Sequence, residues 1–257
     1  MSTLLLASVA TLVFCAPGYP GGAGDAQPFV EQFASAAAAN AGWPAGSLAA
    51  VYDPTEQGGL AKLAGSDAVL AFVPYAFFFQ HAAELHLTPL AQADVVGIGT
   101  QERWTLVAKA GAVKGPASLT GYTLLSVAGY APDFVRRAAL DAWPLPRDVK
   151  IEPTGQLLSA LRRIAAGEHS VALLDQTQAA ALPTLPFAAQ LEAVRQSPPL
   201  PVAIVAVIAA RLPAARARAL QSGLLKMGHA AGDADTLGQL HLKGFVLPQI
   251  PAHTSAP

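Results

Sequence analysis

Residues 66–75 read Ser66-Asp67-Ala68-Val69-Leu70-Ala71-Phe72-Val73-Pro74-Tyr75, an apolar run that stops at a proline and a tyrosine. A helical pattern over residues 76–85 follows at once. This combination indicates a buried parallel strand that leads directly into a helix. The junction, with its tyrosine and the free N–H groups of the helix, then lies at the carboxyl edge of a sheet, where α/β proteins hold small ligands.

Strand-like and helical segments alternate along the rest of the chain. Strands are expected at residues 11–16, 47–52, 67–74, 95–99, 104–108, 123–127, 149–152, 171–174 and 200–210. Helices are expected at residues 25–42, 60–64, 76–85, 132–143, 156–166 and 213–230. In the first helix Asp25 is the expected N-cap, and Phe29 and Phe33 begin the apolar face. The alternation predicts an α/β protein with mostly parallel sheets and helices on both faces.

Composition narrows the class of protein. The chain has 257 residues, of which 53% are hydrophobic and 13% charged, so it can bury one large core or two modest ones. The net charge of −1 offers no broad basic face, which argues against nucleic acid or anionic lipid as a partner. The single cysteine, Cys15, excludes an internal disulfide, and the six histidines lack the spacing of metal ligands. We expect a soluble globular protein without metal or cofactor.

The apolar amino terminus, residues 1–15, does not have the pattern of a secretory signal. Such a signal begins with basic residues, whereas the first lysine or arginine of this chain is Lys62. Phe14 precedes Cys15 where a lipoprotein signal requires a small residue. We therefore interpret residues 11–16 as the first buried strand.

Several segments, taken in order, are similar to one known family. They are Asp67–Ala76, Trp104-Thr105-Leu106-Val107-Ala108-Lys109 leading to Ser118-Leu119-Thr120-Gly121, Ser197-Pro198-Pro199-Leu200-Pro201, and Gly244-Phe245 near the end. The sequence resembles the phosphonate-binding periplasmic proteins, which are the solute receptors of ABC importers. The likeness runs from Thr11 to Val246.

The resemblance implies a two-lobed type 2 periplasmic-binding-protein fold. Each lobe would be a mostly parallel sheet flanked by helices, and a two-stranded hinge near residues 103–108 and 193–207 would join them. Lobe one would comprise residues 1–103 and 196–257, and lobe two residues 104–195. The lobes would close on a small phosphonate- or phosphate-like anion, because helix N-termini at the cleft favour an oxyanion. The resemblance also implies a monomeric receptor in the periplasm with an ABC transporter permease as partner.

Four residues of the first lobe are candidate ligand contacts. Tyr19 follows the first strand in a glycine-rich loop, and its alternative role is packing on the lobe surface. Thr55 and Glu56 stand at the start of the second helix. Thr55 could instead cap this helix, and the helix dipole favours a carboxylate such as Glu56 in the first turn. A ligating Glu56 would select a ligand with an amine or an extra proton. Tyr75 is the strongest candidate, because its phenol emerges where Pro74 ends the strand.

The second lobe offers Tyr130, the backbone N–H of Ala131, Thr154 and Asp175. The resemblance matches the loop around Tyr130 to a serine- and threonine-rich anion loop of the family, but here Tyr130 supplies the only hydroxyl, and Pro132 has no N–H. Thr154 could donate a hydroxyl or cap the following helix. Asp175 matches an acidic position of the family and could bind a ligand amine or cap a helix.

Two other functions remain open at the level of the sequence. A ligand-sensing module of a membrane signalling system would share the fold and the cleft. An enzyme on this fold is disfavoured, because nothing brings Cys15 or a serine near a histidine at a recognisable spacing. Arg103, beside the hinge, could reach the ligand or pair with an acid such as Glu102. The ligand itself stays open among phosphonates, phosphate-like anions, organophosphate esters and neutral solutes.

Overall fold

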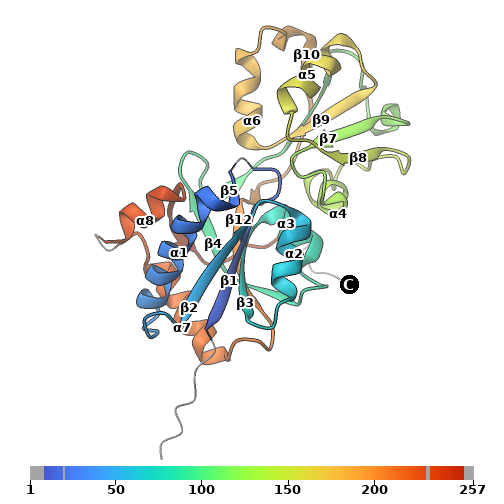
Figure 1. Cartoon of the computed structure of the whole chain (residues 1–257). Helices are drawn as coiled ribbons and strands as arrows, with labels where there is room; N and C mark the ends of the chain where they lie inside the picture. Colours follow the sequence, from blue (N-terminus) through green and yellow to red (C-terminus); the bar gives the residue numbers. More distant parts are fainter. Residues whose placement is uncertain (1–8, 20, 230–231, 252–257) are drawn as a thin grey trace, which may run out of the picture.

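The computed structural model describes residues 9–19, 21–229 and 232–251, and it has two lobes, each built around its own sheet (Figure 1). The prediction for the amino terminus lies outside the described residues as far as residue 8. Among the described residues, no helix has both the length and the apolar character that a membrane span requires.

The first lobe contains a six-stranded sheet in the order β13-β4-β12-β3-β1-β2. Its strands are β1 (Ala10–Cys15), β2 (Leu48–Asp53), β3 (Ala68–Pro74), β4 (Leu87–Val95), β12 (Ala203–Ile208) and β13 (Leu242–Val246). Parallel pairing joins β2, β1 and β3, and antiparallel pairing joins β3, β12, β4 and β13. The sheet is therefore mixed: β1, β2, β3 and β4 point in one direction, and β12, which returns from the second lobe, and β13 point in the other.

Helices cover both faces of the first sheet (Figure 1). They are α1 (Ala23–Asn40), α2 (Glu56–Ala64), α3 (Tyr75–His81), α7 (Ala214–Lys226) and α8 (Asp233–Gln239). Under α1, the rings of Phe14, Phe33, Phe72 and Phe245 pack with centroids 4.9–5.9 Å apart. This aromatic cluster fixes the angle of α1 on the sheet and thereby the position of the β1–α1 loop.

The second lobe contains a five-stranded sheet in the order β10-β6-β9-β7-β8. Its strands are β6 (Thr105–Lys109), β7 (Thr123–Ser126), β8 (Lys150–Pro153), β9 (Ser170–Leu174) and β10 (Leu191–Gln196). Its helical segments are η1 (Pro116–Leu119), α4 (Pro132–Phe134), the π-helical turn η2 (Val135–Ala139), α5 (Leu157–Ala166), α6 (Gln176–Ala181), η3 (Leu182–Thr184) and η4 (Ala188–Gln190). Strands β8, β7 and β9 run parallel, and β6 and β10 pair antiparallel at one edge.

Two segments lying side by side join the lobes. Strand β5 (Gln101–Glu102) pairs antiparallel with β11 (Leu200–Pro201). Beyond this pair, the N–H of Trp104 donates to Ser197 Oγ at 2.9 Å, and the N–H of Ser197 donates to Trp104 O at 2.8 Å. The expected two-stranded link is thus present, and its hydrogen bonds hold both crossings together.

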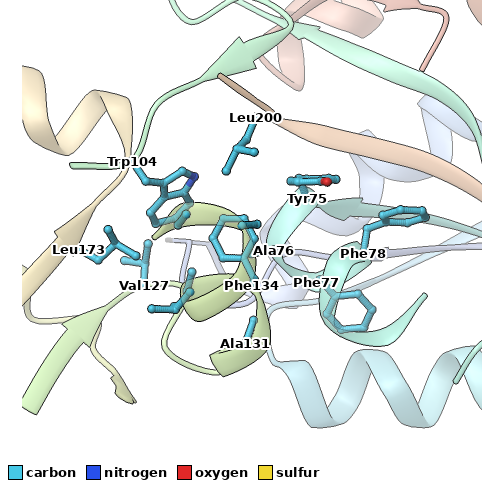
Figure 2. Close-up of a cluster of buried hydrophobic side chains, with 14 of the residues drawn as sticks. Tyr75, Ala76, Phe77, Phe78, Trp104, Val127, Ala131, Phe134, Leu173 and Leu200 are labelled. Carbon is cyan, nitrogen blue, oxygen red and sulfur yellow. The ribbon is translucent and has the colours of Figure 1, made fainter. Parts of the chain in front are cut away.

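A continuous apolar cluster spans the two lobes beside this link (Figure 2). The Phe134 ring of α4 lies with its centroid 5.3 Å from that of Trp104 and 6.1 Å from that of Tyr75 at the start of α3. The backbone N–H of Asp133 donates to Gln80 Oε1 at 3.0 Å across the same interface. The lobes are therefore in contact near the hinge.

Some expected elements differ from the structure. Residues 95–99 were expected as a strand, but β4 ends at Val95, and the N–H of Gly99 donates back to Val95 O at 2.8 Å to close a turn. The strand expected over residues 200–210 is divided into β11 and β12. The helical segment after Pro132 ends at Leu140 and not at residue 143.

The start of α1 also differs. The helix begins at Ala23, so Asp25 lies in its first turn instead of capping it, and Phe29 is 40% exposed. The buried face consists of Val30, Phe33, Ala34, Ala37 and Ala38.

Candidate functional site

A cavity of about 390 Å³ lies between loops of the two lobes. We call it the interlobe cleft. Its lobe-one wall comes from the loops that follow β1 and β2, and its lobe-two wall from the loops that follow β7 and β8; the lining residues are Pro17, Gly18, Pro54, Thr55, Glu56, Gln57, Val127, Tyr130, Pro153, Thr154 and Gly155. The predicted residues Thr55, Glu56, Tyr130 and Thr154 are thus brought together in one hollow.

Thr55 is the N-cap of α2. Its Oγ1 accepts a hydrogen bond from the N–H of Gly58 at 3.1 Å and donates to Asp53 Oδ1 at 2.7 Å. Burial raises the pKa of Asp53, but the hydrogen bonds from Lys62 and Thr55 outweigh it and leave that pKa below its usual range. The ionised Asp53 therefore orients the Thr55 hydroxyl. The first N–H groups of α2 are left to face the cleft.

Glu56 places a carboxylate on the lobe-one wall. Its Oε1 lies 2.8 Å from Nε2 of His81, which is 8% exposed, and His81 Nδ1 lies 3.7 Å from Glu84 Oε2. The histidine therefore holds Glu56 in place from within lobe one, while the Glu56 side chain keeps about a third of its surface exposed (31%).

On the opposite wall, Tyr130 and Thr154 supply hydroxyl groups. Burial, with smaller effects from Cys15 and Glu56, raises the pKa of Tyr130, so its phenol is a neutral hydrogen-bond donor at neutral pH. Thr154 Oγ1 accepts from the N–H of Gln156 at 3.2 Å, just before α5. Thr154 therefore closes a turn ahead of α5, whose N-cap is Gln156, and it lines the cleft at the same time.

The N–H of Ala131, expected as a ligand donor, already has an acceptor in the loop. It donates to Ala128 O at 2.9 Å, and the residue is fully buried. The structure therefore turns this donor inward, because the loop before α4 closes on itself. Arg103 also points elsewhere than expected: its Nη1 donates to Ser197 O at 2.7 Å, so it braces the two crossing segments.

Tyr75 lies in the apolar cluster rather than on the wall of the cleft. Its side chain is 1% exposed, and it borders a gap of only about 10 Å³ shared with Tyr19, Glu102 and Tyr130. Figure 2 shows the ring beside Phe78 and Phe134. The proline that ends β3 directs the tyrosine into the interface between the lobes.

Tyr19 and Asp175 line a second hollow of about 510 Å³, which we call the apolar cavity. Asp175 caps α6: its Oδ1 accepts from the N–H of Gln178 at 2.8 Å, and Gln178 Oε1 accepts from the N–H of Asp175 at 3.1 Å. Burial raises the pKa of Asp175. The predicted capping role of Asp175 is confirmed, and the residue also faces this cavity.

Glu102 is a cavity residue that the sequence analysis considered only as a partner for Arg103. It is 4% exposed, and burial together with the charge of Asp175 raises its pKa to about 8. The sequence carried no signal for this position, because Glu102 stands in the polar run Thr100-Gln101-Glu102-Arg103, and one acid in a short strand does not reveal whether its side chain faces solvent or the interior.

Residues 84–252 match the family described as ABC transporter, phosphonate, periplasmic substrate-binding protein. The chain belongs to this family. The fold and the lobe-spanning cleft agree with the resemblance found in the sequence. A search of curated proteins finds no match to this chain.

Solved structures of similar proteins have the same fold. XAC2383 from Xanthomonas citri, bound to a chloride ion, is 15% identical, with 95% of this chain and 93% of that chain covered and a TM-score of 0.69. PA3383 from Pseudomonas aeruginosa, a binding protein component of an ABC phosphonate transporter, is 16% identical over 93% and 82%, with a TM-score of 0.59. PhnD1 from Prochlorococcus marinus, in complex with methylphosphonate, is 11% identical over 93% and 93%, with a TM-score of 0.55.

Proposed function

We propose that this family member is the solute receptor of an ABC importer and that it binds a small phosphonate- or phosphate-like anion in the interlobe cleft. One observation carries the proposal: the loops after β1, β2, β7 and β8 line a single cavity of about 390 Å³. Those loops stand at the carboxyl ends of strands in both sheets, which is where a ligand can bind both lobes at once.

The chemistry of the cleft supports an anion of low charge. The phenol of Tyr130 and the first N–H groups of α2, whose residues Glu56 and Gln57 line the cleft, would donate hydrogen bonds to an oxyanion. The lining residues include no lysine or arginine. Glu56 faces the same space with a negative charge. A dianion would be repelled, so the expected ligand is a monoanion or carries an amine that pairs with Glu56.

Binding would proceed by closure of the lobes about the two-stranded link. In this proposal lobe one comprises residues 1–103 and 196–257, and lobe two residues 104–195. A ligand that contacts both walls binds the closed form more tightly than the open form and shifts the population toward it. The receptor would act as a monomer in the periplasm and deliver its solute to a permease.

The side chains favour a receptor that does not catalyse a reaction. Burial, followed by the charges of Asp53 and Glu56, raises the pKa of the Cys15 thiol to about 12. Its Sγ also donates to Thr55 O at 3.4 Å, so the thiol stays protonated and is a poor nucleophile.

Calorimetric titration with methylphosphonate tests the ligand class and the site. We expect saturable binding to the wild type and an affinity about tenfold lower for Tyr130→Phe, because one hydrogen bond to a charged group is lost. Tyr122→Phe is the matched control: the Tyr122 ring packs against His169 at a tilt, with ring centroids 3.7 Å apart, and does not line the cleft. Absence of binding to the wild type, or equal affinities for wild type and Tyr130→Phe, would contradict the proposal.

A further inference from the structure

Glu56 is the only charged side chain among the described residues that line the interlobe cleft. Its charge reaches the opposite wall: burial raises the pKa of the Tyr130 phenol most, and Cys15 and Glu56 raise it further. The same charge repels any anion that lies between the two walls. A cleft that binds an anion therefore needs a positive charge near Glu56, and no lysine, arginine or histidine is among the described residues that line it.

His81 contacts Glu56 and does not itself line the cleft. Its Nε2 lies 2.8 Å from Glu56 Oε1, and its ring packs against Phe77 with the ring centroids 4.8 Å apart. His81 is 8% exposed, whereas 31% of the Glu56 side chain is exposed. The imidazole is therefore held in the interior of lobe one, and Glu56 connects it to the cleft.

Acids face both nitrogens of the His81 ring. Glu56 lies at Nε2, and Glu84 Oε2 lies 3.7 Å from Nδ1. Glu84 is mostly in solvent, with 75% of its side chain exposed, so water screens its charge. A protonated imidazole donates an N–H to Glu56 and offsets the charge of the carboxylate. A neutral imidazole can donate an N–H but leaves that charge in place.

The other ionisable groups around this pair have partners of their own or do not titrate near neutral pH. On α2, Lys62 pairs with Asp53. In the α4–η2 segment, which packs against α3, Asp133 lies 3.9 Å from Arg137. Strands β3 and β12 also pack against α3 and contain no ionisable side chain. Burial keeps the Cys15 thiol on β1 protonated, with a pKa of about 12.

We propose that His81 is a positioning residue that sets the ligand specificity of the interlobe cleft through Glu56. When the imidazole is protonated, it pairs with Glu56, and the cleft accepts a monoanion. When the imidazole is neutral, the charge of Glu56 is not offset, and the cleft repels the anion. The inference rests on the proposed function, because it concerns the same anion site.

Calorimetry on the full chain with monomethyl methylphosphonate at pH 5.5 and 8.5 tests this role. The probe has one acidic oxygen and is a monoanion at both pH values, and histidine side chains change charge between them. At pH 5.5 the wild type should bind the probe about fivefold more tightly than His81→Gln, because glutamine keeps an N–H for Glu56 without the positive charge. At pH 8.5 the two proteins should bind it equally.

Two comparisons separate the effect of charge from damage to the structure. His169→Gln alters a histidine of lobe two that packs against Tyr122 and does not line the cleft, so it should match the wild type at both pH values. A His81→Gln variant that only disturbed lobe one would bind more weakly by the same factor at both pH values. Glu102, with a pKa of about 8, also gains charge over this range, but its effect cancels because each comparison is made at one pH.

Glu56→Gln tests the same inference through a gain of affinity. It removes the charge that a neutral His81 leaves in place, so it should bind the probe about fivefold more tightly than the wild type at pH 8.5. Equal affinities of wild type and His81→Gln at pH 5.5, the same loss at both pH values, or no gain for Glu56→Gln would overturn the inference. Absence of binding to the wild type at both pH values would overturn the proposed function, and the inference with it.

Discussion

Single residues decide the chemistry of this receptor, and Glu102 is the clearest case. Burial and the charge of Asp175 raise its pKa from 4.5 to about 8, so the folded protein holds this proton more tightly than the unfolded chain does. The stabilisation is complete below about pH 4.5 and is lost as the pH rises toward 8. Glu102→Gln removes this dependence. The free energy of unfolding of the wild type, relative to Glu102→Gln, should therefore fall between pH 5 and 8 by up to about 1.4 kcal/mol per pH unit.

Urea unfolding of wild type and Glu102→Gln at pH 5.5, 7.0 and 8.5 measures this difference. Glu192→Gln serves as the control, because this half-buried β10 glutamate lines neither the apolar cavity nor the gap beside Tyr75. A difference between wild type and Glu102→Gln that stays constant over the whole pH range would contradict the assignment of a raised pKa to Glu102.

At the scale of elements, the residue that caps α2 also forms part of the wall of the cleft. Thr55 caps α2 through the N–H of Gly58 and is itself held by Asp53. Thr55→Ala should lower the free energy of unfolding by about 1 kcal/mol, and Thr55→Ser should recover most of it, because serine keeps the hydroxyl. Urea unfolding measures both variants. An alanine variant as stable as the wild type would show that the cap contributes nothing.

The same scale explains what could be predicted from the sequence. The strand before Tyr75 and the helix after it were predicted well, because a fully apolar run followed by proline has few alternatives. Strand β4 was missed because Gln92 and Pro89 interrupt its pattern, yet Gln92 is fully buried, donating to Thr100 O and accepting from the N–H of Gln249. Burial of a polar residue depends on partners distant in the sequence, which periodicity cannot reveal.

The candidate site was predicted to a similar extent. Thr55, Glu56, Tyr130 and Thr154 line one cleft because each follows a strand, and parallel strands end at a common edge. Tyr75 follows a strand as well, but the approach of Phe134 from the second lobe encloses its ring. Tyr19 and Asp175, which were predicted as ligand contacts, line the apolar cavity instead. Glu102 of the hinge was not predicted beside them, because only the arrangement of the lobes brings these residues together.

At the scale of the whole molecule, the contact between Gly18 and Val127 reports how closely the two lobes approach each other. Gly18 in the β1–α1 loop has a φ of +83°, and a Cβ added there would lie 2.5 Å from Val127 O on the opposite wall of the cleft. Gly46 has a similar φ of +74° with no atom near its would-be Cβ. Gly18→Ala and Gly46→Ala therefore share the backbone strain, but only Gly18→Ala wedges the lobes apart.

Small-angle X-ray scattering tests the central claim that the lobes close on a ligand held between them. The radius of gyration of the wild type and of Gly46→Ala should decrease when methylphosphonate is added to saturation, while Gly18→Ala should keep the larger radius. A radius that does not change with methylphosphonate in the wild type, or that decreases equally in Gly18→Ala, would contradict closure over the interlobe cleft.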